Sequence, residues 1–373
     1  MGTNSAQTVR VLVVDDSAFM RKAISMMLES DPLIKVIGTA RNGEEGVEKT
    51  RLLKPDLVTM DIEMPRMDGL TALREIMAKN PVPVMMISSI TTEGAQATLD
   101  ALEMGAVDFI PKQMSYVSLD IVKIRDELIA KIKDITRRKN LLMSRFRARR
   151  ISRQHAESRQ IRPSGMTVMR QPGLVSGPVV KKYDHMINII AVGASTGGPL
   201  ALQAVIPKLP RNLPVGAVIA QHMPPTFTKS LAERLNSASQ VLVREAVNGE
   251  PLEPGVVLLS PGGQHLTVRK QGVRTHVYVS DEPTETLYHP CVDILMRSVA
   301  EAFGRFSMGV ILTGMGNNGA AGLAEIKRQG GIIIAQDENS SVVYGMPRAA
   351  IEAGLADHIS PIDDVAQEIL SYF

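Results

Sequence analysis

The chain lacks features that several classes of protein require. It has one cysteine, Cys291, so no disulfide can form within it, and this fits a reducing compartment. No apolar stretch reaches the roughly 18–20 residues of a membrane-spanning helix, and the first six residues contain no apolar signal-peptide core. We therefore expect a cytoplasmic protein with no membrane insertion.

The 373 residues are enough for two domains with separate cores. Residues 131–182 carry 15 basic and 2 acidic side chains, whereas 1–130 and 183–373 are both net acidic. The beginning of this basic segment has helical spacing, and residues 145–182 then become rich in Arg, Gln, Ser, Pro and Gly, which is typical of a flexible linker. Nucleic-acid binding is the alternative, but few aromatics and no groove-reading motif occur there, so we expect no DNA partner.

In the first half, three short apolar runs are each followed by a charged side chain. Asp15 and Asp16 follow the first run, Asp61 follows the second and Lys112 follows the third. The runs are typical of buried parallel strands, whose carboxyl ends meet at one edge of a sheet. Clustered carboxylates there favour Mg²⁺, and one of them can then attack a phosphoryl group. The alternative is that Asp15 and Asp16 cap a helix and Asp61 is an ordinary loop acid.

Together with Ser88 at the end of the run 82–87, this pattern resembles a response-regulator receiver domain over residues 10 to about 127. The resemblance implies that Asp61 is the phosphoacceptor, with a chemotaxis histidine kinase as phosphodonor. It also implies phosphoryl contacts from Ser88 and Lys112 and a switch role for Phe109. The implied ligands of Mg²⁺ are Asp15, Asp16, Asp61 and the backbone carbonyl of Glu63.

In the second half, three polar motifs follow apolar runs. Ser195 lies in the small-residue turn Gly193-Ala-Ser-Thr-Gly-Gly198, and His222 follows the run 215–220. A serine in such a turn, with a histidine as general base, is the arrangement of a nucleophile beside an oxyanion site. Taken singly, Ser195 could cap a helix and His222 could be a packing residue.

The motifs Gly-Ala-Ser-Thr-Gly-Gly, Gln-His-Met-Pro-Pro, Thr-Gly-Met-Gly-Asn and Val-Val-Tyr-Gly-Met-Pro-Arg348 together resemble the catalytic domain of the CheB family of chemotaxis methylesterases, over residues 186–373. The resemblance implies that Ser195 attacks methylated glutamates of chemoreceptor cytoplasmic domains, with His222 as base and no cofactor. The same chemistry would deamidate glutamine. Thr196 and Met315 are the implied residues near the oxyanion, and the unphosphorylated receiver would shield the site.

The chain departs from the family pattern at Asn318, where the family has an Asp that orients the histidine. In the Ser-His-Asp triad that exchange costs roughly 10⁴ in kcat, so we expect intact folding and strongly reduced activity. Deamidation of Asn318-Gly319 would restore the acid. The rival hypothesis is a catalytically silent, phosphorylation-switched binding protein with an esterase fold.

Two further patterns are less specific. Residues 314–319 fit the dinucleotide-binding pattern G-x-G-x-x-G, but this interpretation leaves Ser195 and His222 without a role. The stretches 261–265 and 289–293 resemble family loops near the site. The predicted fold is α/β, with two doubly wound parallel-sheet domains: a receiver (8–130), a basic linker (131–183) and a Rossmann-like esterase (184–373).

Overall fold

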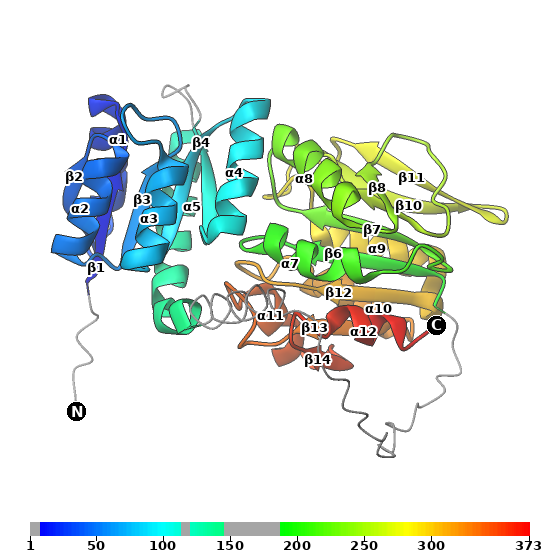
Figure 1. Ribbon diagram of the computed structural model, residues 1–373. Coiled ribbons are helices and arrows are strands. Elements are labelled where there is room, and N and C mark those ends of the chain that lie inside the picture. The colour runs from blue at the N-terminus through cyan, green and yellow to red at the C-terminus, as the bar shows by residue number, and fades with distance from the viewer. Residues whose placement is uncertain (1–7, 113–119, 145–186) are drawn as a thin grey trace, which may run out of the picture.

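The computed structural model describes residues 8–112, 120–144 and 187–373, and these contain two parallel sheets flanked by helices (Figure 1). The first sheet has five strands in the order β2-β1-β3-β4-β5, and the second has seven in the order β14-β13-β12-β6-β7-β9-β8. The predicted α/β class with two doubly wound sheets is confirmed.

The first sheet is formed by five short strands, of which four are largely buried and the edge strand, residues 34–40, is partly exposed. The strands are β1 (Val9–Val14), β2 (Ile34–Ala40), β3 (Leu57–Asp61), β4 (Val84–Ser89) and β5 (Asp108–Lys112). The helices are α1 (Ala18–Glu29), α2 (Gly43–Leu53), α3 (Gly69–Lys79), α4 (Thr92–Met104) and α5 (Asp120–Arg137). Because β1 lies between β2 and β3, the strand order reverses beside it, and ligands of open α/β sheets bind at such a point.

The second sheet repeats this construction with seven parallel strands. They are β6 (Ile189–Ala194), β7 (Gly216–Gln221), β8 (Leu242–Glu245), β9 (Val256–Leu259), β12 (Ser307–Ile311), β13 (Ile332–Gln336) and β14 (His358–Ser360). The helices are α7 (Gly198–Val205), α8 (Pro225–Ala238), α9 (Val292–Phe303), α10 (Ala320–Arg328), α11 (Met346–Glu352) and α12 (Val365–Leu370). β6, β7 and β12 are adjacent, so the loops after them meet at one edge.

An antiparallel hairpin, β10 (His265–Gln271) and β11 (Arg274–Ser280), is added between β9 and α9. It was not predicted from the sequence. The hairpin packs on α9 and leads the chain from the second sheet to the start of that helix.

The predicted domain boundary at residues 130 and 131 lies inside helix α5, which continues to Arg137. Beyond it, Lys139 bonds to Asp56, and Lys133 on the helix bonds to Asp31, so basic side chains of the connector pair with acids of the first domain. The predicted flexible stretch 145–182 lies outside the described residues, and the boundaries stay a prediction.

The two domains are in contact through α4, which packs on α7 and α8 of the second domain (Figure 1). Arg234 on α8 pairs with Asp100 and Glu103 on α4. Phe109 of β5 stacks on Phe227 of α8, with ring centroids 4.5 Å apart. The five-stranded sheet therefore touches the second domain directly. None of the described helices is both long and apolar enough to cross a bilayer.

Candidate phosphoryl site and candidate active site

The predicted carboxylate cluster forms at the carboxyl edge of the first sheet. Ligand oxygens of Asp15, Asp16 and Asp61 lie within 4.8 Å of one another. Lys112 at the end of β5 places its Nζ 2.7 Å from Asp61 and 3.1 Å from Asp15. Gly69 closes this edge from the side of α3, because a Cβ there would lie 1.9 Å from the Asp61 carbonyl oxygen.

Burial raises the pKa of Asp61 to about 6, against the opposing effect of Lys112. Carboxylates this close repel one another, and a hard divalent cation held by oxygen ligands would keep them ionised. The donor set therefore fits Mg²⁺.

The other predicted residues of this site have defined contacts. The Ser88 hydroxyl is buried and donates to the carbonyl of Gly94 at 3.0 Å, so it is held by α4. The side chain of Glu63 accepts from Ser89 at 3.1 Å. Its carbonyl as a metal ligand stays a prediction.

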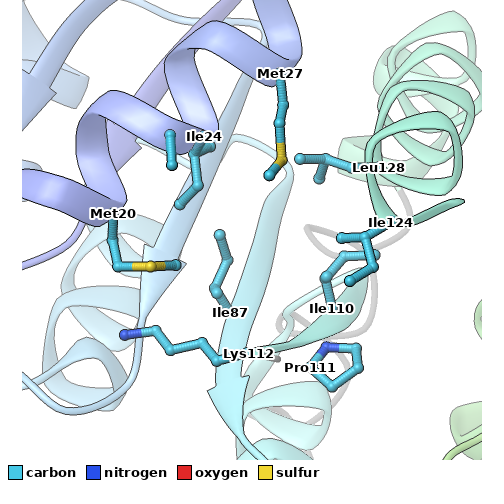
Figure 2. A pocket seen from close by; sticks show the side chains of 10 residues that line it. Met20, Ile24, Met27, Ile87, Ile110, Pro111, Lys112, Ile124 and Leu128 are labelled. Carbon is cyan, nitrogen blue, oxygen red and sulfur yellow. The ribbon is translucent and has the colours of Figure 1, made fainter. Parts of the chain in front are cut away.

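A small apolar cavity of about 40 Å³ lies behind Lys112, between α1, β4, β5 and α5. Figure 2 shows Met20, Ile24 and Met27 of α1 facing Ile124 and Leu128 of α5 across it. Lys112 is the charged residue of its lining, so the cavity adjoins the phosphoryl site without adding an acid or a nucleophile.

Ser195, His222 and Asn318 meet at the carboxyl edge of the second sheet, as predicted. Ser195 follows β6, and its Oγ lies 3.1 Å from Nδ1 of His222, which follows β7. His222 Nε2 lies 3.0 Å from Oδ1 of Asn318, in the loop between β12 and α10. This is the geometry of a nucleophile, a base and an orienting group.

The turn that holds Ser195 is fixed by its backbone. The Ser195 N–H donates to the Thr313 carbonyl at 3.0 Å, and Gln221 donates to the Ser195 carbonyl at 2.9 Å. Gly314 packs against the nucleophile, because a Cβ there would lie 2.9 Å from the Ser195 Cβ. These contacts fix the backbone that carries the nucleophilic hydroxyl.

His222 lies between Ser195, Asn318 and the ring of Tyr288. The two rings stack at 4.2 Å with planes 7° apart. Burial lowers the pKa of His222 to about 4, and the hydrogen bond to Asn318 opposes this effect. The imidazole is therefore neutral at neutral pH, as a general base must be.

The two residues predicted near the oxyanion lie beside Ser195 and in the β12–α10 loop. Among the described residues, the buried Oγ1 of Thr196 has no hydrogen-bond partner. Met315 is partly buried and packs against a hydrophobic cluster that includes Leu128 and Ile132 of α5. The first domain thus reaches the loop beside the nucleophile.

Two partners of the site were not predicted from the sequence. Tyr288 belongs to no motif, and Asp293 lies in the stretch 289–293, whose sequence gives Asp293 no specific role. Asp293 Oδ2 accepts from Asn318 Nδ2 at 2.9 Å. This contact depends on the position of α9, which no spacing in the sequence predicts.

Comparison with known proteins agrees with the two sites. The family model "CheB methylesterase" matches residues 190–369, and "Response regulator receiver domain" matches residues 11–121. The chain is 50% identical to protein-glutamate methylesterase/protein-glutamine glutaminase 1 of Oleidesulfovibrio alaskensis, over 97% of this chain and 99% of that protein. A relative of the same function name from Pyrococcus abyssi is 43% identical over 98% of this chain and 94% of that protein.

Among solved structures, the catalytic domain of Thermotoga maritima CheB methylesterase is 40% identical, with a TM-score of 0.49, over 50% of this chain and 99% of that one. The relatives match both halves of the chain in one alignment, and the receiver and esterase motifs each form a site. The chain belongs to the CheB family of receiver-containing methylesterases.

Proposed function

We propose that this protein hydrolyses methyl esters of glutamate side chains on chemoreceptor cytoplasmic domains, and deamidates glutamines there, under control of phosphorylation at Asp61. The observation that carries the proposal is the continuous hydrogen-bonded chain Ser195–His222–Asn318. It acts in the cytoplasm, with a chemotaxis histidine kinase as phosphodonor.

The esterase step begins at Ser195. His222 Nδ1 accepts the hydroxyl proton while Oγ attacks the γ-carbonyl carbon, and the carbonyl oxygen becomes an oxyanion. The Thr196 hydroxyl and backbone N–H groups near Met315 are the proposed donors to that oxygen. His222 then protonates the departing methoxide, which leaves as methanol. Water, giving its proton to His222, cleaves the acyl-serine, and that proton returns to Ser195 Oγ. These steps are carried by side chains and backbone alone.

The receiver step concerns Asp61 and its surroundings. Asp15, Asp16, Asp61 and the Glu63 carbonyl are the proposed ligands of Mg²⁺, which supplies charge neutralisation for the incoming phosphoryl group. Lys112 would contact the phosphoryl oxygens directly. Ser88 of β4 would reach them by leaving the Gly94 carbonyl, which would release a hydrogen bond between β4 and α4.

The consequence for the esterase follows from the interdomain contacts. Phe109 stacks on Phe227, and α4 pairs with Arg234, so a change at β5 and α4 acts on the surface that holds the receiver against the catalytic domain. We propose that phosphorylation shifts the population from this closed arrangement to one that admits the receptor.

The test is methanol release from methylated receptor with a small-molecule phosphodonor present. Ser195→Ala should lower kcat by at least roughly 10³-fold, because the nucleophile is lost. Ser371→Ala, which removes a hydroxyl at the end of α12, should leave kcat unchanged. Equal measurable rates for the starting chain and Ser195→Ala would refute the role of Ser195, and no methanol release from either chain would favour a silent binding protein.

A further inference from the structure

The third member of the site is an amide whose two ends have different partners. Asn318 Oδ1 accepts from His222 Nε2 at 3.0 Å and from the Val292 N–H at 2.8 Å. Asn318 Nδ2 donates to Asp293 Oδ2 at 2.9 Å and to the Cys291 sulfur at 3.2 Å. Asp293 in turn accepts from the N–H of Gly322 through its other oxygen, at 2.8 Å.

These polarities allow one orientation of the amide. A carboxylate can only accept, so it requires the NH₂ end of Asn318 to face Asp293. The Val292 N–H can only donate, so it requires the oxygen end at the opposite side. Turning the amide over would place NH₂ against the Val292 N–H and oxygen against the Asp293 carboxylate, which leaves both contacts repulsive.

The amide orientation fixes the histidine tautomer. With Oδ1 facing it, His222 Nε2 must carry the ring proton, and Nδ1 is then free to accept the proton of Ser195 Oγ. The opposite orientation would favour a bare Nε2 and a protonated Nδ1, which cannot take a proton from serine. In a serine-protease triad, the wrong tautomer is the reason that Asp→Asn is so damaging.

We propose that Asp293 is a positioning residue of the active site: through the amide of Asn318 it selects the reactive tautomer of His222, and it supplies the negative charge that a triad carboxylate would otherwise provide. The proposal rests on the proposed esterase function for its catalytic consequence. It also bears on the expected effect of Asn318, because an acid stands directly behind the amide.

Other charged or titratable groups near His222 also affect its pKa. Tyr288 stacks on the ring, and burial together with the charges of Glu127 and Lys131 on α5 acts on the pKa of His222. Asp293 raises this pKa, in the direction that stabilises the imidazolium formed during acyl transfer. Glu127 and Lys131 belong to the receiver, whereas Asp293 belongs to the same domain as His222.

The first variant is Asp293→Asn in the full chain. Its Oδ1 can still accept from Gly322, so the start of α10 keeps its hydrogen bond, but its NH₂ now opposes the NH₂ of Asn318. We expect kcat for methanol release to fall by at least roughly 100-fold, because His222 would carry its proton on the wrong nitrogen. KM should stay within about twofold, because substrate binding does not depend on that proton. The melting temperature shows whether the variant is folded.

The matched control is the exchange Asn318→Asp with Asp293→Asn. The carboxylate introduced by Asn318→Asp would then accept from His222, Val292 and the new amide, and that amide would still serve Gly322, so each polarity is satisfied again. We expect kcat to return to within about tenfold of the starting chain. Asn318→Asp alone places two carboxylates together, and such a pair retains one proton and one negative charge. Its gain should therefore stay far below roughly 10⁴-fold.

A readout independent of turnover is the tautomer of His222, from imidazole ¹⁵N shifts in the resting chain, with His222→Gln identifying its signals. Asp293→Asn should move the proton from Nε2 to Nδ1, and the exchanged pair should restore it. An unchanged tautomer and kcat in folded Asp293→Asn would overturn the proposal, as would an exchanged pair that folds but stays inactive. If the tautomer switches while the starting chain releases no methanol, the positioning role holds and the proposed function fails.

Discussion

At the residue scale, the site joins a neutral base to a distant acid. His222 contacts the amide oxygen of Asn318, and the carboxylate that completes the arrangement lies one hydrogen bond further, on Asp293. The loss of the acid from a catalytic motif therefore does not by itself indicate an inactive enzyme. In our proposal, the amide of Asn318 passes the orienting effect of Asp293 on to His222. The strong loss of activity expected from Asn318 alone stays a prediction, and the Asn318→Asp comparison measures it.

The lowered pKa of His222 has a measurable consequence. Burial favours the neutral ring, so an NMR titration of the resting chain should find a midpoint near 4, below the ordinary value of 6.5. The unfolded chain binds more protons between these values, so this histidine lowers the free energy of unfolding as pH falls through that window. A midpoint at or above 6.5 would contradict the buried neutral base.

Asp61 shows the opposite linkage. Its pKa rises from 3.8 to about 6 on folding, so its stabilising contribution is complete below 3.8 and is lost as pH rises through about 6. At neutral pH without Mg²⁺, Asp61→Asn should therefore stabilise the receiver by up to about 3 kcal/mol, measured by urea unfolding.

Mg²⁺ should raise the unfolding midpoint of the starting chain at neutral pH, because it binds the folded carboxylate cluster. The gain should be much smaller in Asp61→Asn. If Mg²⁺ raised the unfolding midpoint equally in both chains, the ion would bind at a site that does not include Asp61. Ser371→Ala, far from the cluster in the catalytic domain, serves as the control.

At the scale of elements, the sequence predicted the strands that lead to the site residues, because their signal is local, but not the outer strands β2, β8, β9 and β14. A short apolar run indicates a buried strand, and the polar residue that follows it directly, such as Asp61 or His222, indicates the group at its carboxyl end. Both signals lie within a few residues of each other. The position of α9 is different. Asp293 reaches Asn318 because α9 and α10 pack together across an apolar face, and that contact joins residues from separate motifs. The hairpin β10–β11 was not predicted, although apolar and polar residues alternate on both sides of its Gly272 turn.

The pairing of α4 with α8 gives a prediction about basal activity. Arg234 on α8 is about one-fifth exposed and contacts two acids of α4. Arg234→Ala removes an interdomain attraction of about 1 kcal/mol, so methanol release without a phosphodonor should rise up to about fivefold. The rate with a phosphodonor should change little.

The control for this variant is Arg328→Ala on α10. Arg328 also pairs with a glutamate, Glu325, but the pair lies on a single helix and joins no domains. Its basal rate should stay that of the starting chain. A rise in both variants would show a general loss of stability, and a rise in neither would show that the α4–α8 ion pairs do not hold the closed state.

At the scale of the whole molecule, two domains built on parallel sheets are in contact through α4, β5 and α5 of the first domain. Phe109 links the phosphoryl site to α8, and the cluster around α5 reaches Met315 beside the nucleophile. The sequence predicted both sites and their order, but not this boundary, because interdomain packing leaves no periodic signal. The shielding implied by the resemblance stays a prediction, and α4, β5 and α5 are the receiver elements that contact the catalytic domain.

One contact across the domain boundary offers a place for a fluorescent probe of domain separation. The guanidinium of Arg138, just beyond α5, lies 5.7 Å from the ring of Tyr344 in the catalytic domain, and the chain contains no tryptophan. Tyr344→Trp would create a lone indole beneath a cation. Its emission should shift when a phosphodonor separates the domains, and the shift should vanish in the same chain with Asp61→Asn. An unchanged spectrum in an active chain would mean that Arg138 and residue 344 stay together while the site opens. Because the chain has no tryptophan of its own, the fluorescence of this one substituted residue would report the separation of the two domains in real time, with no attached dye.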